Sequence, residues 1–337
     1  MTMVIKSRAP LRISFAGGGT DVSPFPEKYN GTVVNATINK YTDIGLKLRK
    51  DKKLTIKLNG LKKIVYPNIK KISHDDKFDQ VLAVIKHFYQ KPEGLDIQIR
   101  MGISSPGLGS SSSLFVSLIG GFNELLKLKL NKYKIAQLAF NLERKKLKNL
   151  GGRQDQYAST FGGINWMEFR GATKVKVIPL RLFSKTIRQL ENALILLDIG
   201  KRISPDKLMK DQIKNIKTNK ETIRAMLATK KITFEVKKAL LSSDLNKLGQ
   251  LLDQAWQLKK KFTPLISNQR IDSLYEKFKK VGALGGKIAG SGGGGHMLIL
   301  CQPNKKNAIK KEAKKFKIKP QEFKFDFSGL SVKKISC

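Results

Sequence analysis

Two glycine-rich segments of the sequence are typical of backbone that approaches a phosphate closely. The first occupies residues 104–113 and leads directly into an apolar helix expected to end near Leu126. Glycines allow a tight turn that directs N–H groups into one cavity, and the helix N-terminus adds the positive end of its dipole. The four serine hydroxyls at 110–113 can donate to phosphate or bind magnesium. This segment is neither a P-loop nor a dinucleotide-binding motif, because it has neither glycine pattern. A flexible turn is the alternative, but such turns rarely precede so apolar a helix.

The second segment, residues 285–295, ends in the four glycines 292–295. A flexible linker would have polar neighbours. Here Lys287-Ile288-Ala289 precede the four glycines and an apolar strand, 296–301, follows them. We therefore expect this backbone to approach a ligand or another loop closely.

Three acids are candidates for the chemistry in this basic chain. Phosphoryl transfer requires a carboxylate near the attacking hydroxyl and another on the metal. Asp155 follows Gly151-Gly152 and lies twelve positions after Glu143. From spacing alone, Asp155 could instead pair with Arg153, and Glu143 could be a surface helix charge. Asp21 follows three glycines, and it could bind substrate hydroxyls or cap a turn.

The elements that must position these residues differ between the two halves of the chain. In the first half, hydrophobic periodicity predicts strands at 11–15, 33–38, 41–46, 95–100 and 164–169, and helices at 78–89 and 134–148. In the second half it predicts helices at 207–227, 234–241, 245–261 and 307–316, and strands at 193–197, 296–301 and 322–327. We therefore predict two domains, residues 1–180 and 181–337.

Length and composition agree with two globular domains. The chain has 337 residues, of which 40% are hydrophobic and 27% charged. This length exceeds the usual limit of one hydrophobic core. No segment resembles an export signal or a membrane span, so we expect a cytoplasmic protein. Two cysteines, Cys301 and Cys337, are too few for a disulfide framework, and the three scattered histidines predict no histidine-bound zinc site.

The formal net charge of +40 raises the question of a nucleic-acid partner. The 66 basic residues comprise 54 Lys and 12 Arg, which are spread along the whole chain with few aromatic neighbours. A nucleic-acid surface usually clusters its basic residues and relies on Arg. We therefore expect a lysine-rich solvated surface that favours anionic ligands, and no nucleic-acid partner. The sequence predicts no particular oligomeric state.

Three motifs in order along the chain resemble those of the GHMP kinases, the superfamily of galactokinase, homoserine kinase, mevalonate kinase and phosphomevalonate kinase. They are residues 10–21 (PLRISFAGGGTD), 107–111 (GLGSS) and 287–295 (KIAGSGGGG). The resemblance implies an α+β fold whose N-terminal half is similar to ribosomal S5 domain 2 and whose C-terminal half is ferredoxin-like. ATP and a sugar would lie in the cleft between these halves.

Within that superfamily the chain looks most like the kinases of D-glycero-D-manno-heptose 7-phosphate. Ala16-Gly17-Gly18-Gly19-Thr20-Asp21 replaces the Gly-Glu-His-Thr-Asp pattern of galactokinases, and further matches lie at 152–157, 200–204, 256–259 and 282–287. The resemblance implies phosphorylation of the anomeric hydroxyl with ATP and Mg²⁺, towards nucleotide-activated heptose. The alternatives are a kinase of fucose, galactose or a uronic acid, and a non-catalytic relative that binds ATP or a polyanion.

The resemblance also implies roles for individual residues. Asp155 matches the catalytic base, Arg12 matches an arginine beside it, and Glu143 with Ser110 or Ser111 matches the magnesium ligands. ATP would contact Gly107, Leu108, Gly109, Ser110, Ser111, Ser112 and Ser113. The substrate would contact Gly18, Gly19, Thr20, Asp21 and Arg202. The third motif contributes Gly290, Gly292, Gly293 and Gly294.

Two further expectations concern the first glycine-rich loop and the binding of a phosphate on the substrate. The first loop departs from the family pattern, because Ser105 and Pro106 precede Gly107, which stiffens the entry to the loop. A sugar that already carries a phosphate needs cationic partners, and Arg153, Lys201 and Arg202 are the candidates.

Overall fold

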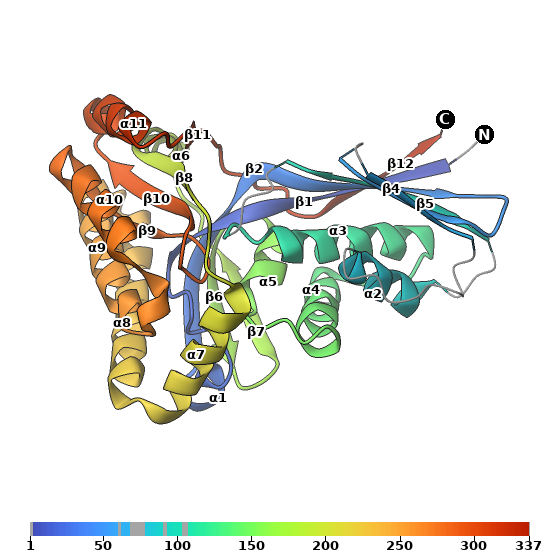
Figure 1. Ribbon diagram of the computed structural model, residues 1–337, viewed down its shortest axis with the longest axis horizontal. Helices are drawn as coiled ribbons and strands as arrows, with labels where there is room; N and C mark the ends of the chain where they lie inside the picture. Colours follow the sequence, from blue (N-terminus) through green and yellow to red (C-terminus); the bar gives the residue numbers. More distant parts are fainter. Residues whose placement is uncertain (1–2, 60–61, 68–77, 90–92, 103–106, 337) are drawn as a thin grey trace.

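The computed structural model describes residues 3–59, 62–67, 78–89, 93–102 and 107–336, which form two β-sheets and the helices that cover them (Figure 1). The residues 104–106 of the first glycine-rich segment, as well as His74 and Cys337, lie outside these ranges. The predicted α+β class is confirmed. Within the described ranges, no helix combines the length and the apolar character that a membrane crossing requires.

The larger sheet contains strands from both ends of the chain. Its order is β12-β1-β2-β5-β3-β4, and β6 pairs with β2 and with β7. All pairs are antiparallel except β3 with β5. The strands are β1 (Met3–Ala16), β2 (Gly31–Leu48), β3 (Leu54–Leu58), β4 (Lys62–Tyr66), β5 (Leu95–Met101), β6 (Ile164–Arg170), β7 (Lys174–Pro179) and β12 (Ser331–Ser336).

Helices of the first half pack on one face of this sheet (Figure 1). They are α2 (Asp79–Phe88), α3 (Ser110–Leu125), α4 (Lys132–Phe140) and α5 (Gln154–Phe161). The helix predicted at 134–148 consists of α4 and a π-helical turn, η2 (Asn141–Lys146). Such turns occur frequently at functional sites, and this one carries Glu143.

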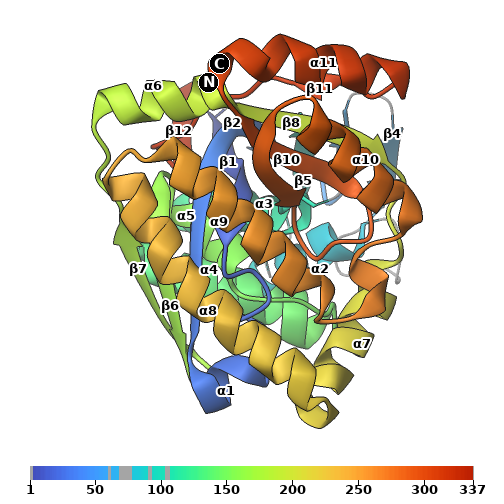
Figure 2. The same ribbon diagram turned by 90° about the vertical axis from the view of Figure 1, so that its left-hand side faces the viewer.

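The smaller sheet is antiparallel and has the order β11-β8-β10-β9. Its strands are β8 (Leu194–Gly200), β9 (Ala283–Ile288), β10 (Gly295–Cys301) and β11 (Pro320–Gln321). The helices of the second half are α6 (Ser184–Ala193), α7 (Pro205–Thr218), α8 (Lys220–Leu241), α9 (Leu245–Lys260), α10 (Gln269–Lys280) and α11 (Lys306–Lys315). Three short helical segments complete the described elements, namely α1 (Phe25–Tyr29), η3 (Pro264–Ile266) and η4 (Pro303–Lys305). α8 and α9 run side by side (Figure 2).

Two predicted elements of the second half are wrong. The helix predicted at 207–227 is broken at Asn219, whose side chain caps α8 by accepting from the N–H groups of Glu221 and Thr222. The strand predicted at 322–327 is absent, and in that stretch Phe325 alone forms an isolated bridge, to Ile38.

A turn after residue 325 explains the missing strand. The Asp326 carboxylate accepts from the backbone N–H groups of Ser328 and Gly329, and Phe327 is 53% exposed. The chain then continues as β12, which pairs with β1. The alternating aromatics at 323 and 325 are buried as a strand pattern suggests, but the chain turns before a ladder can form.

β1 changes along its length from a strand covered on one face to a strand covered on both. Its beginning alternates, with Ile5 and Ser7 buried, whereas every residue from 9 to 16 is buried. Helices α3 and α5 contact β1 from the first half, and α8 and α9 contact it from the second. Arg12 is therefore held in the interior, 3% exposed, between the two halves.

The two halves share one hydrophobic core. It includes Ile13 of β1, Val236 of α8 and Leu252 of α9. α9 approaches β9 closely, because a Cβ atom on Gly285 would lie 1.9 Å from the carbonyl oxygen of Gly249. The division at residue 180 stays a prediction, and the final strand lies in the sheet of the first half.

Candidate active site

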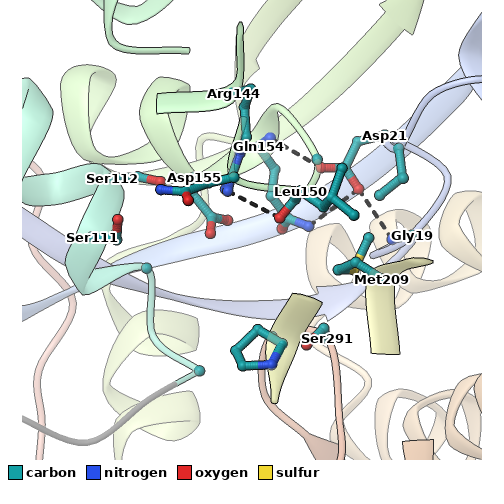
Figure 3. Close-up of a pocket in the computed structure, with 18 of the residues that line it drawn as sticks. Gly19, Asp21, Ser111, Ser112, Arg144, Leu150, Gln154, Asp155, Met209 and Ser291 are labelled. Carbon is teal, nitrogen blue, oxygen red and sulfur yellow. Dashed lines mark hydrogen bonds between the residues drawn. The ribbon is translucent and has the colours of Figure 1, made fainter. Parts of the chain in front are cut away.

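A cavity of about 380 Å³ lies where the two halves meet. It extends from Ser111 and Ser112 past Asp155 to Asp21 (Figure 3). Twelve of the predicted site residues line it, namely Arg12, Gly19, Asp21, Gly107, Gly109, Ser110, Ser111, Ser112, Glu143, Asp155, Arg202 and Gly290.

The first glycine loop leads into the N-terminus of α3. Gly107 and Gly109 have φ values of 109° and 79°, which residues other than glycine rarely adopt. The first N–H groups of a helix have no partner within it, and they attract anions. Gly290 packs against this loop, because a Cβ there would lie 2.8 Å from the carbonyl oxygen of Gly107. The two glycine-rich segments therefore meet at one end of the cavity.

Glu143 faces the serines of this loop. The hydroxyls of Ser111 and Ser112 donate to its two carboxylate oxygens over 2.6 and 2.7 Å. The Gln156 amide donates to the same carboxylate over 2.7 Å. Glu143 is 1% exposed, so it is not the surface helix charge that spacing alone allowed. One carboxylate and adjacent hydroxyls form the hard oxygen donor set that Mg²⁺ prefers.

Asp155 pairs with Arg12 rather than with Arg153. The Nε and NH2 groups of Arg12 donate to its two carboxylate oxygens over 2.7 and 2.8 Å. Arg153 instead donates to the carbonyl of Gly171 and lies over the Phe169 ring. The bidentate pair fixes the orientation of the Asp155 carboxylate, which remains 17% exposed toward the cavity.

Asp21 caps a turn and also lines the cavity. Its carboxylate accepts from the N–H groups of Gly19 and Gln154, each over 3.0 Å. Gln154 is the first residue of α5, so this bond fixes the start of the helix that carries Asp155. A Cβ on Gly152 would lie 1.9 Å from Asp21 Oδ2, which explains the glycine at that position.

Two buried lysines and the half-buried Arg202 lie at the second glycine loop. Arg202 donates to the carbonyl of Gly292 over 3.1 Å and contacts Ser291, and Lys259 donates to the carbonyl of Gly290. Lys259 and Lys287 are 4% and 3% exposed.

Burial lowers the pKa of all three side chains, and neighbouring cations lower it further. Burial followed by the charge of Arg12 lowers the pKa of Arg202 to about 10 and that of Lys287 to about 7. Burial, then the charge of Lys287, lowers the pKa of Lys259 well below its usual value. The cause is the cost of holding charge away from water beside like charge.

Seven predicted residues do not line the cavity. Thr20 is buried, and its hydroxyl donates to the carbonyls of Gly17 and Thr32. Ser113 is also buried, and its hydroxyl donates to the carbonyl of Ser110. The other five are Gly18, Leu108, Gly292, Gly293 and Gly294. Gly294 shapes the loop, because a Cβ there would lie 2.3 Å from the Lys201 carbonyl oxygen.

Several residues of the cavity were not predicted. Among the polar ones are Arg144, Asn149, Gln154, Gln212 and Lys259. Lys287, which lies behind the cavity lining, carries a sequence signal, because it interrupts the glycine-rich and apolar run 285–289, whereas Lys259 is the first of three consecutive lysines. A lysine in such a run is buried with its charge, which is rare without a functional reason. The other polar residues of the cavity carry no such signal.

Comparison with known proteins finds similarity along the whole chain. The model of the GHMP kinases N terminal domain matches residues 78–163, and that of the GHMP kinases C terminal domain matches residues 236–319. The chain is 34% identical to D-glycero-alpha-D-manno-heptose 7-phosphate kinase of Campylobacter jejuni, over 97% of this chain and 98% of that protein.

Solved structures show the same similarity. A D-glycero-D-manno-heptose 1-phosphate kinase from Bacteroides thetaiotaomicron superimposes with a TM-score of 0.84 at 28% identity, covering 99% of this chain and all of that one. Lactococcus lactis galactokinase complexed with galactose shares the fold, with a TM-score of 0.78 at 20% identity over 98% of this chain and 95% of that one. The predicted two-part fold is therefore confirmed.

Lys287 makes the stability of the ligand-free protein depend on pH. Its pKa is about 7 in the folded protein, whereas a lysine in the unfolded chain titrates near 10.4. Between these values the unfolded state binds more protons, so the free energy of unfolding rises with pH. From about pH 7 to about pH 9.5 we expect wild type to gain about 3 kcal/mol relative to Lys287→Met.

Urea denaturation across this pH range measures the difference. Lys280→Met removes an exposed lysine and serves as the control, whose pH dependence should follow that of wild type. Parallel curves for wild type and Lys287→Met would contradict the lowered pKa of Lys287.

Proposed function

Because this chain belongs to the GHMP kinases and is an ATP-dependent phosphotransferase, we propose that its acceptor is the anomeric hydroxyl of D-glycero-D-manno-heptose 7-phosphate. The observation that carries this proposal is 34% identity, over nearly the full length of both chains, to a kinase named for that sugar phosphate. The cavity supports it, because the cationic side chains of Arg202 and Lys259 line the same space as the carboxylates of Glu143 and Asp155.

The loop at residues 107–112 would bind the phosphates of ATP. The left-handed glycines and the N-terminus of α3 offer backbone N–H groups, and Ser110 to Ser112 offer hydroxyls on the same wall. Arg12 NH1 donates to the carbonyl of Gly107 over 2.7 Å, which ties the loop to the Arg12–Asp155 pair. The terminal phosphate would therefore lie close to Asp155.

Magnesium fits the donor set around Glu143. Glu143 and Ser111 would hold the ion, and Ser111 already donates to that carboxylate. No group of three or more His, Cys, Asp or Glu side chains is gathered in the described ranges, so phosphate and water would complete the coordination. When bound, the ion neutralises negative charge on the phosphates.

Asp155 would act as the general base of the transfer. Its carboxylate accepts the proton of the anomeric hydroxyl, whose oxygen bonds to the γ-phosphorus while the bond to the bridging oxygen of ADP breaks. Arg12 holds both Asp155 oxygens and offsets charge on the transferring group. Asp21 and the Gln154 side chain, which lie farther along the cavity, would bind the sugar hydroxyls (Figure 3).

Asp155→Asn should lower turnover by about 100-fold or more while ATP still binds, because an amide does not accept the hydroxyl proton. Steady-state kinetics with a coupled ADP assay and direct nucleotide binding measure both effects. Asp96→Asn is a matched control, since Asp96 also pairs with an arginine, Arg49, but lies outside the cavity. Turnover within threefold of wild type would contradict the role of Asp155.

Glu143→Gln should raise the magnesium concentration needed for the half-maximal rate, because one anionic ligand of a hard cation is lost. Glu124→Gln removes an equal charge from α3, where Glu124 pairs with Lys334 at the surface, and it should titrate as wild type does. An unchanged magnesium dependence of Glu143→Gln would exclude Glu143 as a ligand.

The proposed acceptor is tested by comparing sugars with and without a phosphate. The 7-phosphorylated heptose should exceed free heptose by about 100-fold in kcat/KM, which corresponds to about 2.7 kcal/mol. The assay measures ADP release at one fixed ionic strength, with fucose, galactose and uronic acids included. Higher efficiency with one of these sugars, or equal efficiency with free heptose, would refute the proposed acceptor.

A further inference from the structure

Three cations at the second glycine loop lack the carboxylate partner that buried charges normally have. In the part of the chain that the structure describes, Arg202, Lys259 and Lys287 form no ion pair. Arg202 and Lys259 bond to backbone carbonyls instead. Uncompensated buried charge costs several kcal/mol per ion, so a bound anion is the natural partner.

The three cations respond to different carboxylates. Beyond burial, the charges of Arg12 and then Asp155 act on the pKa of Arg202, and all three side chains line the cavity. Beyond burial, the charge of Arg12 lowers the pKa of both lysines, and the charge of Asp21 raises it. Asp21 lies at the other end of the cavity from Ser111 and Ser112 of the nucleotide loop (Figure 3). Lys259 lines the same cavity as Asp21, so its charge is available to an anionic group of the acceptor.

A second feature of the same region also points to a ligand. Gln212 on α7 lines the cavity and is 2% exposed, yet its Nε2 donor has no partner among the residues that the structure describes. This donor would lie 3.2 Å from a Cβ on Gly19, and the Phe262 ring would lie 2.8 Å from the same Cβ. Phe262 comes three residues after Lys259. A buried amide donor without a partner costs free energy that an anionic or hydroxyl acceptor would restore.

We propose that Lys259 and the Gln212 amide bind the phosphate group that the acceptor already carries, and that Lys287 supports this subsite through its charge. Lys287 does not line the cavity, but its charge is the largest electrostatic influence on Lys259 after burial. This inference rests on the proposed function and deepens it, since it names the residues that select a phosphorylated sugar. Arg202 serves the transferring group instead.

The inference predicts that Lys259→Met and Arg202→Ala have different kinetic signatures. Lys259→Met should reduce the preference for the phosphorylated over the free heptose by tenfold or more. Arg202→Ala should lower kcat/KM for both sugars by similar factors and leave the preference nearly unchanged. Lys261→Met, two residues on and exposed, is the matched control and should retain the wild-type preference. Gln212→Leu, which removes the donor and preserves the bulk, should act in the same direction as Lys259→Met.

A binding measurement tests the subsite without turnover. The nucleotide site is first saturated with magnesium and a non-hydrolysable ATP analogue, and inorganic phosphate is then added as the probe. Phosphate should raise the melting temperature of wild type and of Lys261→Met, and this shift should fall at least fivefold in Lys259→Met. The melting temperature without phosphate should rise in Lys259→Met, because an uncompensated buried charge is removed, so the variant reports on binding rather than on misfolding.

The outcomes separate this inference from the proposed acceptor. Equal losses of kcat/KM for both sugars in Lys259→Met, or weaker binding of the ATP analogue, would assign Lys259 to the transferring phosphate and overturn the inference. An unchanged phosphate shift in Lys259→Met would also overturn it. A wild type without preference for the phosphorylated heptose, but with a phosphate shift that depends on Lys259, would refute the acceptor and retain the subsite.

Discussion

The Arg12 side chain holds the candidate site together. Its guanidinium donates to both oxygens of Asp155 and to the carbonyl of Gly107, and its backbone N–H donates to the carbonyl of Leu108. Strand β1, the start of α5 and the first glycine loop are thus fixed relative to one another by one residue. This geometry depends on the coverage of β1 by helices of both halves, which keeps Arg12 in the interior.

Three of the carboxylates that line the cavity, those of Glu143, Asp155 and Asp21, have different kinds of partner. Glu143 accepts from two hydroxyls and an amide beside the nucleotide loop. Asp155 is held by a single arginine and remains partly open to the cavity. Asp21 accepts from backbone N–H groups and so fixes the start of α5. The environment of each carboxylate, rather than its residue type, is what supports the different roles proposed for the three acids.

The positive charge of this chain is of two kinds, exposed lysines at the surface and buried lysines at the cavity. Lysines on the surface give the chain a net charge of +40, which attracts anions over long distances but does not orient them. Lys259 and Lys287 are different, because burial removes the water that screens the surface lysines. Their charges destabilise the ligand-free protein. Under the proposed function, the same charges would be available to an anionic substrate.

The sequence by itself determined the family, the mixed fold, both glycine-rich segments and the candidate acids. These features are local, because glycines, serines and acids at fixed spacing identify a motif before the chain folds. Spacing alone allowed Asp155 to pair with its neighbour Arg153, whereas the family resemblance implied Arg12. The tertiary structure shows the pair with Arg12, which is 143 positions away. Likewise, the burial of Ser113 and the turn at Asp326 depend on segments that are distant in the sequence. Partners, burial and the pKa values that result from them are set by long-range packing, and periodicity in one sequence carries no information about it.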